Sequence, residues 1–393
     1  MRTRLIGLGT LAAALLAAFS VSAQQTVRIG LILPYSGQFA DTATQLDNGI
    51  KLYMKQKGDT VAGRKIEIIR KDTGGVAPDV AKRLAQELVV RDNVDILAGF
   101  VLTPNALAAA DVSTEAKKFM VVMNAATSII TTKSPYLVRT SLTLPQVADP
   151  FGTWAVQKAG VKKCYTMVSD YGPGHDVERA FTEAFKAAGG EIVGAVRFPV
   201  ANPDFSAFVQ RAKDLNPECI MIFVPGGTQP AALGKALAER GIDPNKTKVL
   251  GTGEVTAEQA LKSMGDAGLG IISAWHFDYK GTSKLNQEFT KAFNDEHKRN
   301  PDFFSIGGYD GMHLIYEALK KTGGKTDGDA LIAAAKGMQW ESPRGPISID
   351  PETRDIIQTI YIRRVQKVGG ELVNVVFDKI DSVKDPVKAR MKK

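Results

Sequence analysis

Two short clusters of small and polar residues follow apolar runs, at positions suited to holding an anion. Gly99-Phe100-Val101-Leu102-Thr103-Pro104 ends one run and opens a helical pattern, so the Thr103 hydroxyl and the free amides of a helix N-terminus could hold a carboxylate. The alternative for Thr103 is a plain N-cap. Asn124-Ala125-Ala126-Thr127 is a second corner of this kind, and two such corners together favour an anion site.

Further clusters supply aromatic rings and a carboxylate. Within Ser169-Asp170-Tyr171-Gly172-Pro173-Gly174, Tyr171 could cover an apolar ligand, or it could pack on the surface as a turn aromatic. Glu254, in Gly251-Thr252-Gly253-Glu254, would suit a cationic ammonium, or it could be an exposed glutamate at a helix start. Trp275-His276 and Tyr309-Asp310 could line a pocket. The candidate ligand-binding residues are Thr103, Pro104, Ala126, Thr127, Tyr171, Glu254, Phe100, Trp275 and Tyr309.

Motifs for catalysis and metal binding are missing from the sequence. It contains no GxSxG and no Walker loop, and Gly251-Thr252-Gly253 is an incomplete dinucleotide fingerprint. His175 has no obvious nucleophile at hand. The four histidines show no ligand spacing, and there is no CxxC. We therefore predict no catalytic residue, no metal and no cofactor. An α/β enzyme with a dispersed active site is the alternative, and turnover of a bound ligand would favour it.

The elements that must position these residues alternate between strand and helix. Such alternation requires right-handed βαβ crossovers and parallel sheets covered on both faces. The first series has strands at 27–33, 65–70, 95–98 and 119–123, with helices at 41–57, 77–90 and 104–116. The second has strands at 163–169, 192–198, 219–224, 248–250 and 270–274, with helices at 144–158, 174–187, 204–215 and 229–240. The candidate residues thus follow strand ends, where open α/β sheets bind ligands.

The last third of the chain departs from this alternation. Helices are predicted at 284–299, 305–321 and 329–336, followed by a break at Arg344-Gly345-Pro346. Segments 357–365 and 372–377 flank Gly369-Gly370 and read as an antiparallel pair. The basic group at the C-terminus is interpreted as a solvated end, and it comprises Lys384, Lys388, Arg390, Lys392 and Lys393.

The N-terminus and the two cysteines indicate the compartment. Arg2 and Arg4 precede an apolar run at 5–19 and the small residues 21–23, which is the pattern of a cleaved secretory signal peptide. About 15 apolar residues are too few to span a bilayer, so we expect a protein exported to the periplasm. Export permits a disulfide. We nevertheless expect no bridge between Cys164 and Cys219, because side chains on neighbouring parallel strands seldom meet its geometry.

The order of motifs resembles that of the leucine/isoleucine/valine-type periplasmic binding proteins of ABC importers, over essentially the whole mature chain. The similar segments are 27–37, Asn48-Gly49, 96–104, 123–127, 138–140, 169–172 and 308–310. The resemblance implies that the corner at Thr103 and Ala126-Thr127 holds a ligand carboxylate, that Tyr171 is the aromatic cleft residue, and that Glu254 receives an α-ammonium. Pro104 departs from the Ser/Thr-rich corner of the amino-acid binders and lacks an amide hydrogen.

The resemblance implies the fold class: α/β, type I periplasmic binding protein, with two Rossmann-like lobes with parallel central sheets joined by a three-crossover hinge. We expect a signal peptide at 1–23, an N-terminal lobe of 24–143 plus 276–343, and a C-terminal lobe of 144–275 plus 344–393. The expected function is capture of a branched-chain amino acid or small carboxylic acid for an ABC permease and its ATPase subunits, by a monomer without nucleic-acid partners. Binding of an aromatic acid, suited by Tyr171, Trp275 and Phe100, and a ligand-sensing role are the alternatives.

Overall fold

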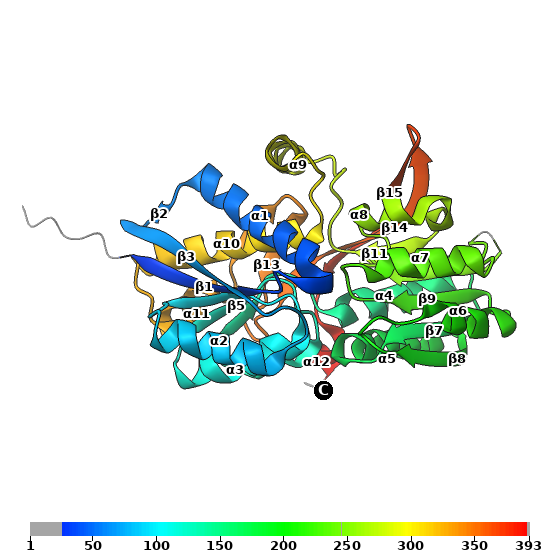
Figure 1. The fold of residues 1–393 in the computed structure, drawn as a ribbon, viewed down its shortest axis with the longest axis horizontal. Coiled ribbons are helices and arrows are strands. Elements are labelled where there is room, and N and C mark those ends of the chain that lie inside the picture. Colours follow the sequence, from blue (N-terminus) through cyan, green and yellow to red (C-terminus); the bar gives the residue numbers. More distant parts are fainter. Residues whose placement is uncertain (1–25, 245, 391–393) are drawn as a thin grey trace, which may run out of the picture.

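The computed structural model describes residues 26–244 and 246–390, which form two α/β lobes side by side (Figure 1). The predicted signal peptide lies outside these residues. Within them, no helix is both long and apolar enough to cross a membrane. The fold class is confirmed, because each lobe is built around its own sheet with a parallel central part and helices packed on its faces.

The sheet of the first lobe has the strand order β2-β3-β1-β4-β5-β6. All pairs are parallel except β2 with β3. Its central strands are apolar and buried on both faces, as parallel sheets require. The strands are β1 (Val27–Leu33), β2 (Thr60–Val61), β3 (Arg64–Asp72), β4 (Ile96–Gly99), β5 (Phe119–Val122) and β6 (Leu137–Arg139).

Helices from two separate parts of the chain belong to this lobe. They are η1 (Gly37–Phe39), α1 (Ala40–Lys57), α2 (Pro78–Val90), α3 (Thr103–Glu115), η2 (Ser128–Thr132), α9 (Lys284–His297), α10 (Phe303–Lys321) and α11 (Gly328–Ala335). Glycines allow α1 and α10 to touch along their backbones: a Cβ on Gly49 would lie 1.9 Å from the Ser305 carbonyl oxygen, and one on Gly308 would lie 2.1 Å from that of Leu46. This contact anchors α10 to the first lobe.

A longer, mixed sheet is centred on the second lobe, in the order β12-β13-β14-β11-β10-β9-β7-β8, with β15 on the other side of β14. Its β12–β13 end contacts the first lobe, where Trp340 and Ser342 donate to Asp310 of α10. Strands β7 to β11 pair in parallel, whereas the β14–β15 hairpin is antiparallel. The strands are β7 (Lys163–Ser169), β8 (Glu191–Phe198), β9 (Cys219–Phe223), β10 (Lys248–Thr252), β11 (Ile272–Trp275), β12 (Gln339–Ser342), β13 (Gly345–Ile349), β14 (Ile356–Val368) and β15 (Glu371–Val383). The helices are α4 (Leu144–Gln157), α5 (Gly172–Ala187), α6 (Phe205–Asp214), α7 (Gln229–Glu239), α8 (Glu258–Met264) and η3 (Gly265–Gly268). The last helix, α12 (Pro386–Arg390), lies between the two lobes (Figure 1).

The expectation that the cysteines stay apart is wrong. Cys164 and Cys219 form a disulfide between the parallel neighbours β7 and β9. The two residues are direct partners in the strand register, so both side chains leave the sheet on the same face. Their Cα atoms are 4.5 Å apart, at the short end of the range that a disulfide spans.

Buried Arg344 fixes the place where the chain passes between the lobes. Its guanidinium donates to the backbone oxygens of Thr140 and Ser141, and it lies 3.0 Å from His276 Nδ1. It is paired with Asp310 of α10 at 2.9 Å. The connections near residues 140–141 and 276 therefore run beside this buried ion pair, and Gln358, near the start of β14, also accepts from Arg344.

Candidate ligand-binding cavity

A cavity of about 380 Å³ lies between the two lobes, where strands of both sheets end. Lining segments follow the carboxyl ends of β4 and β5 in the first lobe and of β7, β9 and β10 in the second. The lining residues are Phe39, Thr42, Val101, Leu102, Thr103, Asn124, Ala126, Leu144, Tyr171, Pro173, Phe223, Pro225, Gly226, Glu254 and Phe304.

The first-lobe wall carries a pair of threonine hydroxyls. Thr103 Oγ1 lies 2.8 Å from Thr127 Oγ1, and both residues are buried. The N-cap alternative for Thr103 is wrong, because Leu102 is the N-cap of α3 and Thr103 is its first residue. Thr103 Oγ1 is thus bonded to another hydroxyl rather than to the amides of its own helix. Its remaining lone pair or proton can serve a ligand.

The second lobe packs directly on this pair. A Cβ on Gly172, the first residue of α5, would lie 3.2 Å from Thr127 Oγ1. Both α3 and α5 therefore begin at the cavity, and both have proline in their first turn, Pro104 and Pro173. Proline has no amide hydrogen, but the other amides of each first turn have no acceptor within their helix. Two helix N-termini from opposite lobes thus present a positive potential to the same space.

Aromatic rings form the apolar part of the cavity. Tyr171, the N-cap residue of α5, stacks on Phe223 with ring centroids 6.2 Å apart and an interplanar angle of 26°. Burial raises the pKa of Tyr171, and the nearby Glu254 carboxyl raises it further. The phenol therefore stays neutral. Phe39 and Phe304 line the cavity from the first lobe, so a flat ring would meet aromatic surface on both sides.

Glu254 is the one carboxyl among the lining residues, and none of them is a lysine or arginine. The alternative of an exposed glutamate at a helix start is wrong: Glu254 is 8% exposed and lies in the loop between β10 and α8. Its Oε2 atom has no hydrogen-bond partner. Burial raises the pKa of Glu254 to about 8, although Thr252 and Arg363 act to lower it. Near neutral pH the carboxyl holds a proton, and it can donate to a ligand oxygen or accept from a ligand hydroxyl.

The structure does not bring every candidate residue to the cavity. Phe100 packs into a separate core cluster between the sheet and helices α2 and α3. Trp275 is fully buried behind the cavity wall, where a Cβ on Gly253 would lie 2.1 Å from its ring. The Tyr309 hydroxyl donates to Gln56 at 2.7 Å, within the contact of α1 and α10. Pro104 is in the first turn of α3 and is not a lining residue.

Several lining residues were missed by sequence reasoning. Phe223 ends strand β9 and Pro225 and Gly226 follow it, so the rule that ligands lie beyond the carboxyl ends of strands would have found them. Phe39 and Phe304 lie near the starts of α1 and α10, where no sequence signal separates a cavity wall from core packing. Thr127 is not a lining residue but contributes through its bond to Thr103.

Comparison with known proteins agrees with this geometry. A family model described as periplasmic binding protein matches residues 26–370. The Leu/Ile/Val-binding protein homolog 6 of Brucella melitensis is 41% identical over 380 residues, which cover 94% of this chain and 97% of that protein.

Two solved structures from Rhodopseudomonas palustris are also similar to the chain, and both are solute-binding proteins of ABC transporters. The protein of strain BisB5, in complex with 3,4-dihydroxybenzoic acid, is 55% identical with a TM-score of 0.89, covering 92% of this chain and 99% of that one. The protein of strain HaA2, in complex with p-hydroxybenzoic acid, is 41% identical with a TM-score of 0.90, covering 93% and 100%.

Proposed function

The chain belongs to the periplasmic binding protein family, and from this premise we propose that its cavity takes a small aromatic carboxylic acid with ring hydroxyl groups. The observation that carries the proposal is the composition of the cavity: aromatic rings from both lobes, no basic side chain, and one buried carboxyl with an unpartnered oxygen. The two Rhodopseudomonas relatives are in complex with acids of this class.

Each part of such an acid has a matching part of the wall. The carboxylate faces the Thr103–Thr127 hydroxyls and the N-termini of α3 and α5, which stabilise an anion without a cation. The ring lies against Tyr171 and Phe223. A ring hydroxyl meets Glu254, whose Oε2 lacks a partner within the protein. A buried group left unpaired in this way is costly, so a ligand that pairs it gains affinity.

A branched-chain amino acid is the second candidate, favoured by Glu254 and by the name of the Brucella relative. An α-ammonium beside Glu254 would lower the pKa of the carboxyl, so that its proton is released to solvent and the carboxylate forms an ion pair with the ammonium. Aliphatic side chains make less use of the stacked Tyr171 and Phe223 than a flat ring does. We therefore place the amino acid second.

The proposed transport cycle involves binding only, with no chemical step. The exported, monomeric protein captures the acid as its lobes close about the segments beside Arg344, and then delivers it to a permease served by ATPase subunits. Cleavage of the predicted signal peptide at 1–23 places it in the periplasm.

A ligand series tests the proposal. Calorimetric titration of the purified mature protein with 3,4-dihydroxybenzoate, 4-hydroxybenzoate, benzoate and leucine should give binding by the hydroxylated acids about tenfold tighter than by benzoate, because only they pair Glu254. In Glu254→Leu this preference should disappear while benzoate still binds. Leucine binding more tightly than every benzoate would overturn the proposal.

The anion side of the cavity is tested separately. Thr103→Val keeps the shape but removes the hydroxyl that meets Thr127, and the Kd for 3,4-dihydroxybenzoate should rise about tenfold. Thr114→Val is the matched control, because Thr114 lies on the same helix and bonds only to backbone oxygens, those of Ala110 and Lys133. Equal affinities of the two variants would remove Thr103 from the site.

A further inference from the structure

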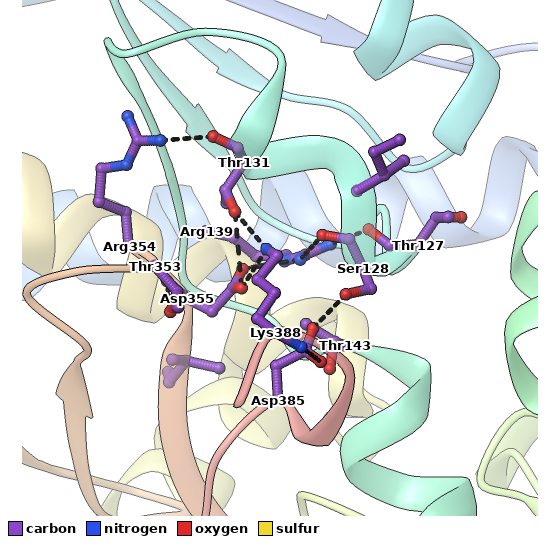
Figure 2. A network of polar contacts seen from close by, with 12 residues as sticks. Thr127, Ser128, Thr131, Arg139, Thr143, Thr353, Arg354, Asp355, Asp385 and Lys388 are labelled. Atoms are coloured by element: carbon purple, nitrogen blue, oxygen red, sulfur yellow. Dashed lines mark hydrogen bonds and ion pairs between the residues drawn. The ribbon is translucent and has the colours of Figure 1, made fainter. Parts of the chain in front are cut away.

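Residues 125–128 form one corner of the cavity, which we call the 125–128 corner. A buried guanidinium supports it from behind (Figure 2). Arg139, the last residue of β6, is fully buried. It donates to the backbone oxygens of Ala125 at 3.1 Å, Thr127 at 2.8 Å and Ser128 at 3.4 Å. Because three carbonyls of the corner converge on one side chain, the position of Arg139 determines the path of the corner. Through that path it sets where the Thr127 hydroxyl meets Thr103.

Arg139 is in turn held by residues from the end of the chain. Asp355 accepts from Arg139 at 2.7 and 3.0 Å and from Lys388 Nζ at 2.5 Å. Lys388 also contacts Thr131 Oγ1, and Asp385 accepts from Ser128 Oγ at 2.5 Å. All four charged side chains are buried, and two cations balance two carboxylates. The interpretation of the C-terminal basic group as a solvated end is therefore wrong for Lys388, which is 6% exposed.

The same C-terminal segment, residues 385–390, also contacts the second lobe. Arg390 pairs with Asp149 of α4 and with Glu183 of α5, at 2.9 Å from the latter. Asp176 of α5 accepts from the backbone amide of Ser128 at 2.8 Å. In Figure 1, α12 lies between the two lobes. The C-terminal segment thus connects the 125–128 corner of the first lobe to the two helices of the second lobe that meet it.

We propose that Lys388 and Asp355 are positioning residues for ligand binding, which act through Arg139 on the 125–128 corner. Neither residue lines the cavity. Lys388 holds Asp355 against Arg139, and Arg139 holds the three carbonyls, so losing the Lys388 ammonium loosens the corner from behind. The inference rests on the proposed function for the choice of ligand, but the state of the corner is measured without any ligand.

The test compares Lys388→Met with Lys384→Met in the mature protein. Lys384 belongs to the same basic group, but its side chain is 60% exposed and pairs with Asp350. Hydrogen exchange of the amides in 125–131 is measured without ligand, and the Kd for 3,4-dihydroxybenzoate is measured by calorimetry. In Lys388→Met we expect the exchange rate of these amides and the Kd to rise about tenfold each, with no change in Lys384→Met.

The two readouts separate the possible failures. If Lys388 has only a general structural role, Lys388→Met melts at a lower temperature while exchange at 125–131 and the Kd stay at wild-type values, and the proposal is overturned. If Lys388→Met does not fold, Ser128→Ala removes the bond to Asp385 from the side of the corner and should raise the same exchange rates. Should the wild type not bind the probe, the proposed function fails, and the exchange measurement still decides whether Lys388 positions the corner.

Discussion

The ligand cavity and the network behind it are both buried and polar, but only the network satisfies its own polar atoms. No side-chain polar atom of Arg139, Asp355, Lys388 or Asp385 lacks a partner. At the cavity, Glu254 Oε2 has none. Unpaired buried groups destabilise a fold, and a ligand that supplies the partner removes this cost. Complete pairing instead fixes a geometry, which is what a supporting network requires.

The two regions also differ in charge. The cavity carries no basic side chain, whereas the network behind it contains two cations and two carboxylates. Because those charges are paired with one another, they add little net potential at the cavity. Attraction for an anion is then left to the starts of α3 and α5. The groups that bind the ligand are thus different from the groups that support the cavity. Substitutions in one set should therefore have effects different from substitutions in the other.

The largest expected effect follows from unbalancing the network. Asp355→Asn leaves Arg139 and Lys388 buried without their shared carboxylate. Breaking a buried ion pair by removing one partner costs about 3–5 kcal/mol, so the free energy of unfolding should fall by that amount in urea denaturation. Asp381→Asn is the control, since Asp381 pairs with Lys379 and its side chain is 57% exposed. A loss below about 1 kcal/mol would contradict the contrast between the two regions.

The disulfide provides a variant that loses stability without touching either region. Cys164 and Cys219 are separated by 55 residues and are buried in the second sheet. Replacing both with alanine should lower the free energy of unfolding by about 2–4 kcal/mol, because the unfolded chain regains freedom. The Kd for 3,4-dihydroxybenzoate should stay within about twofold of the wild-type value. A much weaker Kd would mean that any loss of stability loosens the cavity, and the effect of Lys388→Met could then not be assigned to positioning.

Most of the fold could be predicted from the sequence because its strands and helices have clear periodic patterns. The ranges predicted for β1 and β7 agree with the structure to the residue. Short elements were missed: β6 has only three residues and α12 only five, too few for a period to be read. The hairpin β14–β15 was found, but β15 continues to Val383, beyond the predicted end at Phe377, because its outer half is polar.

The site could be predicted only where a residue follows a strand. Thr103, Ala126, Tyr171 and Glu254 do so, and all four line the cavity. Trp275 follows the strand predicted at 270–274, but in the structure it is the last residue of β11 and is buried in the core. The support from Lys388 and Asp355 could not be foreseen, because it depends on contacts between residues more than 200 positions apart in the chain, as the Arg139–Asp355 bond shows. Composition alone made Lys388 look like part of an exposed tail.

A smaller effect is expected from the unpaired carboxyl of the cavity. The pKa of Glu254 is raised from 4.5 to about 8 by burial, so between these values the folded protein holds a proton that the unfolded chain has released. The stability that this protonated carboxyl contributes is full below the unfolded pKa and is lost as the pH rises through the folded one. Glu254→Gln has no proton to lose. As the pH rises from about 5 to about 9, the free energy of unfolding of Glu254→Gln should therefore increase by about 1–3 kcal/mol relative to that of the wild type.

Urea denaturation of the ligand-free proteins at several pH values measures this difference. Glu183→Gln serves as the control, because the Glu183 side chain is 53% exposed and lies outside the cavity. Parallel curves for wild type and Glu254→Gln would show that the carboxyl is ionised throughout. In that case Glu254 could no longer donate to a ligand oxygen, and it could only accept from a ligand hydroxyl or pair with a cation.

The smallest effect is expected at Tyr309, which lies outside the cavity and should not affect ligand affinity. Its hydroxyl donates to Gln56, and its ring packs edge-on against Tyr53 and Phe289, with centroids 5.0 and 4.9 Å away. Tyr309→Phe keeps these ring contacts, so it should lose only the one hydrogen bond, about 1 kcal/mol of stability, and leave the Kd for 3,4-dihydroxybenzoate within about twofold. Titration beside Thr103→Val gives the comparison. A tenfold loss of affinity in Tyr309→Phe would mean that the packing of α1 against α10 affects ligand binding indirectly, because Tyr309 is not a lining residue of the cavity.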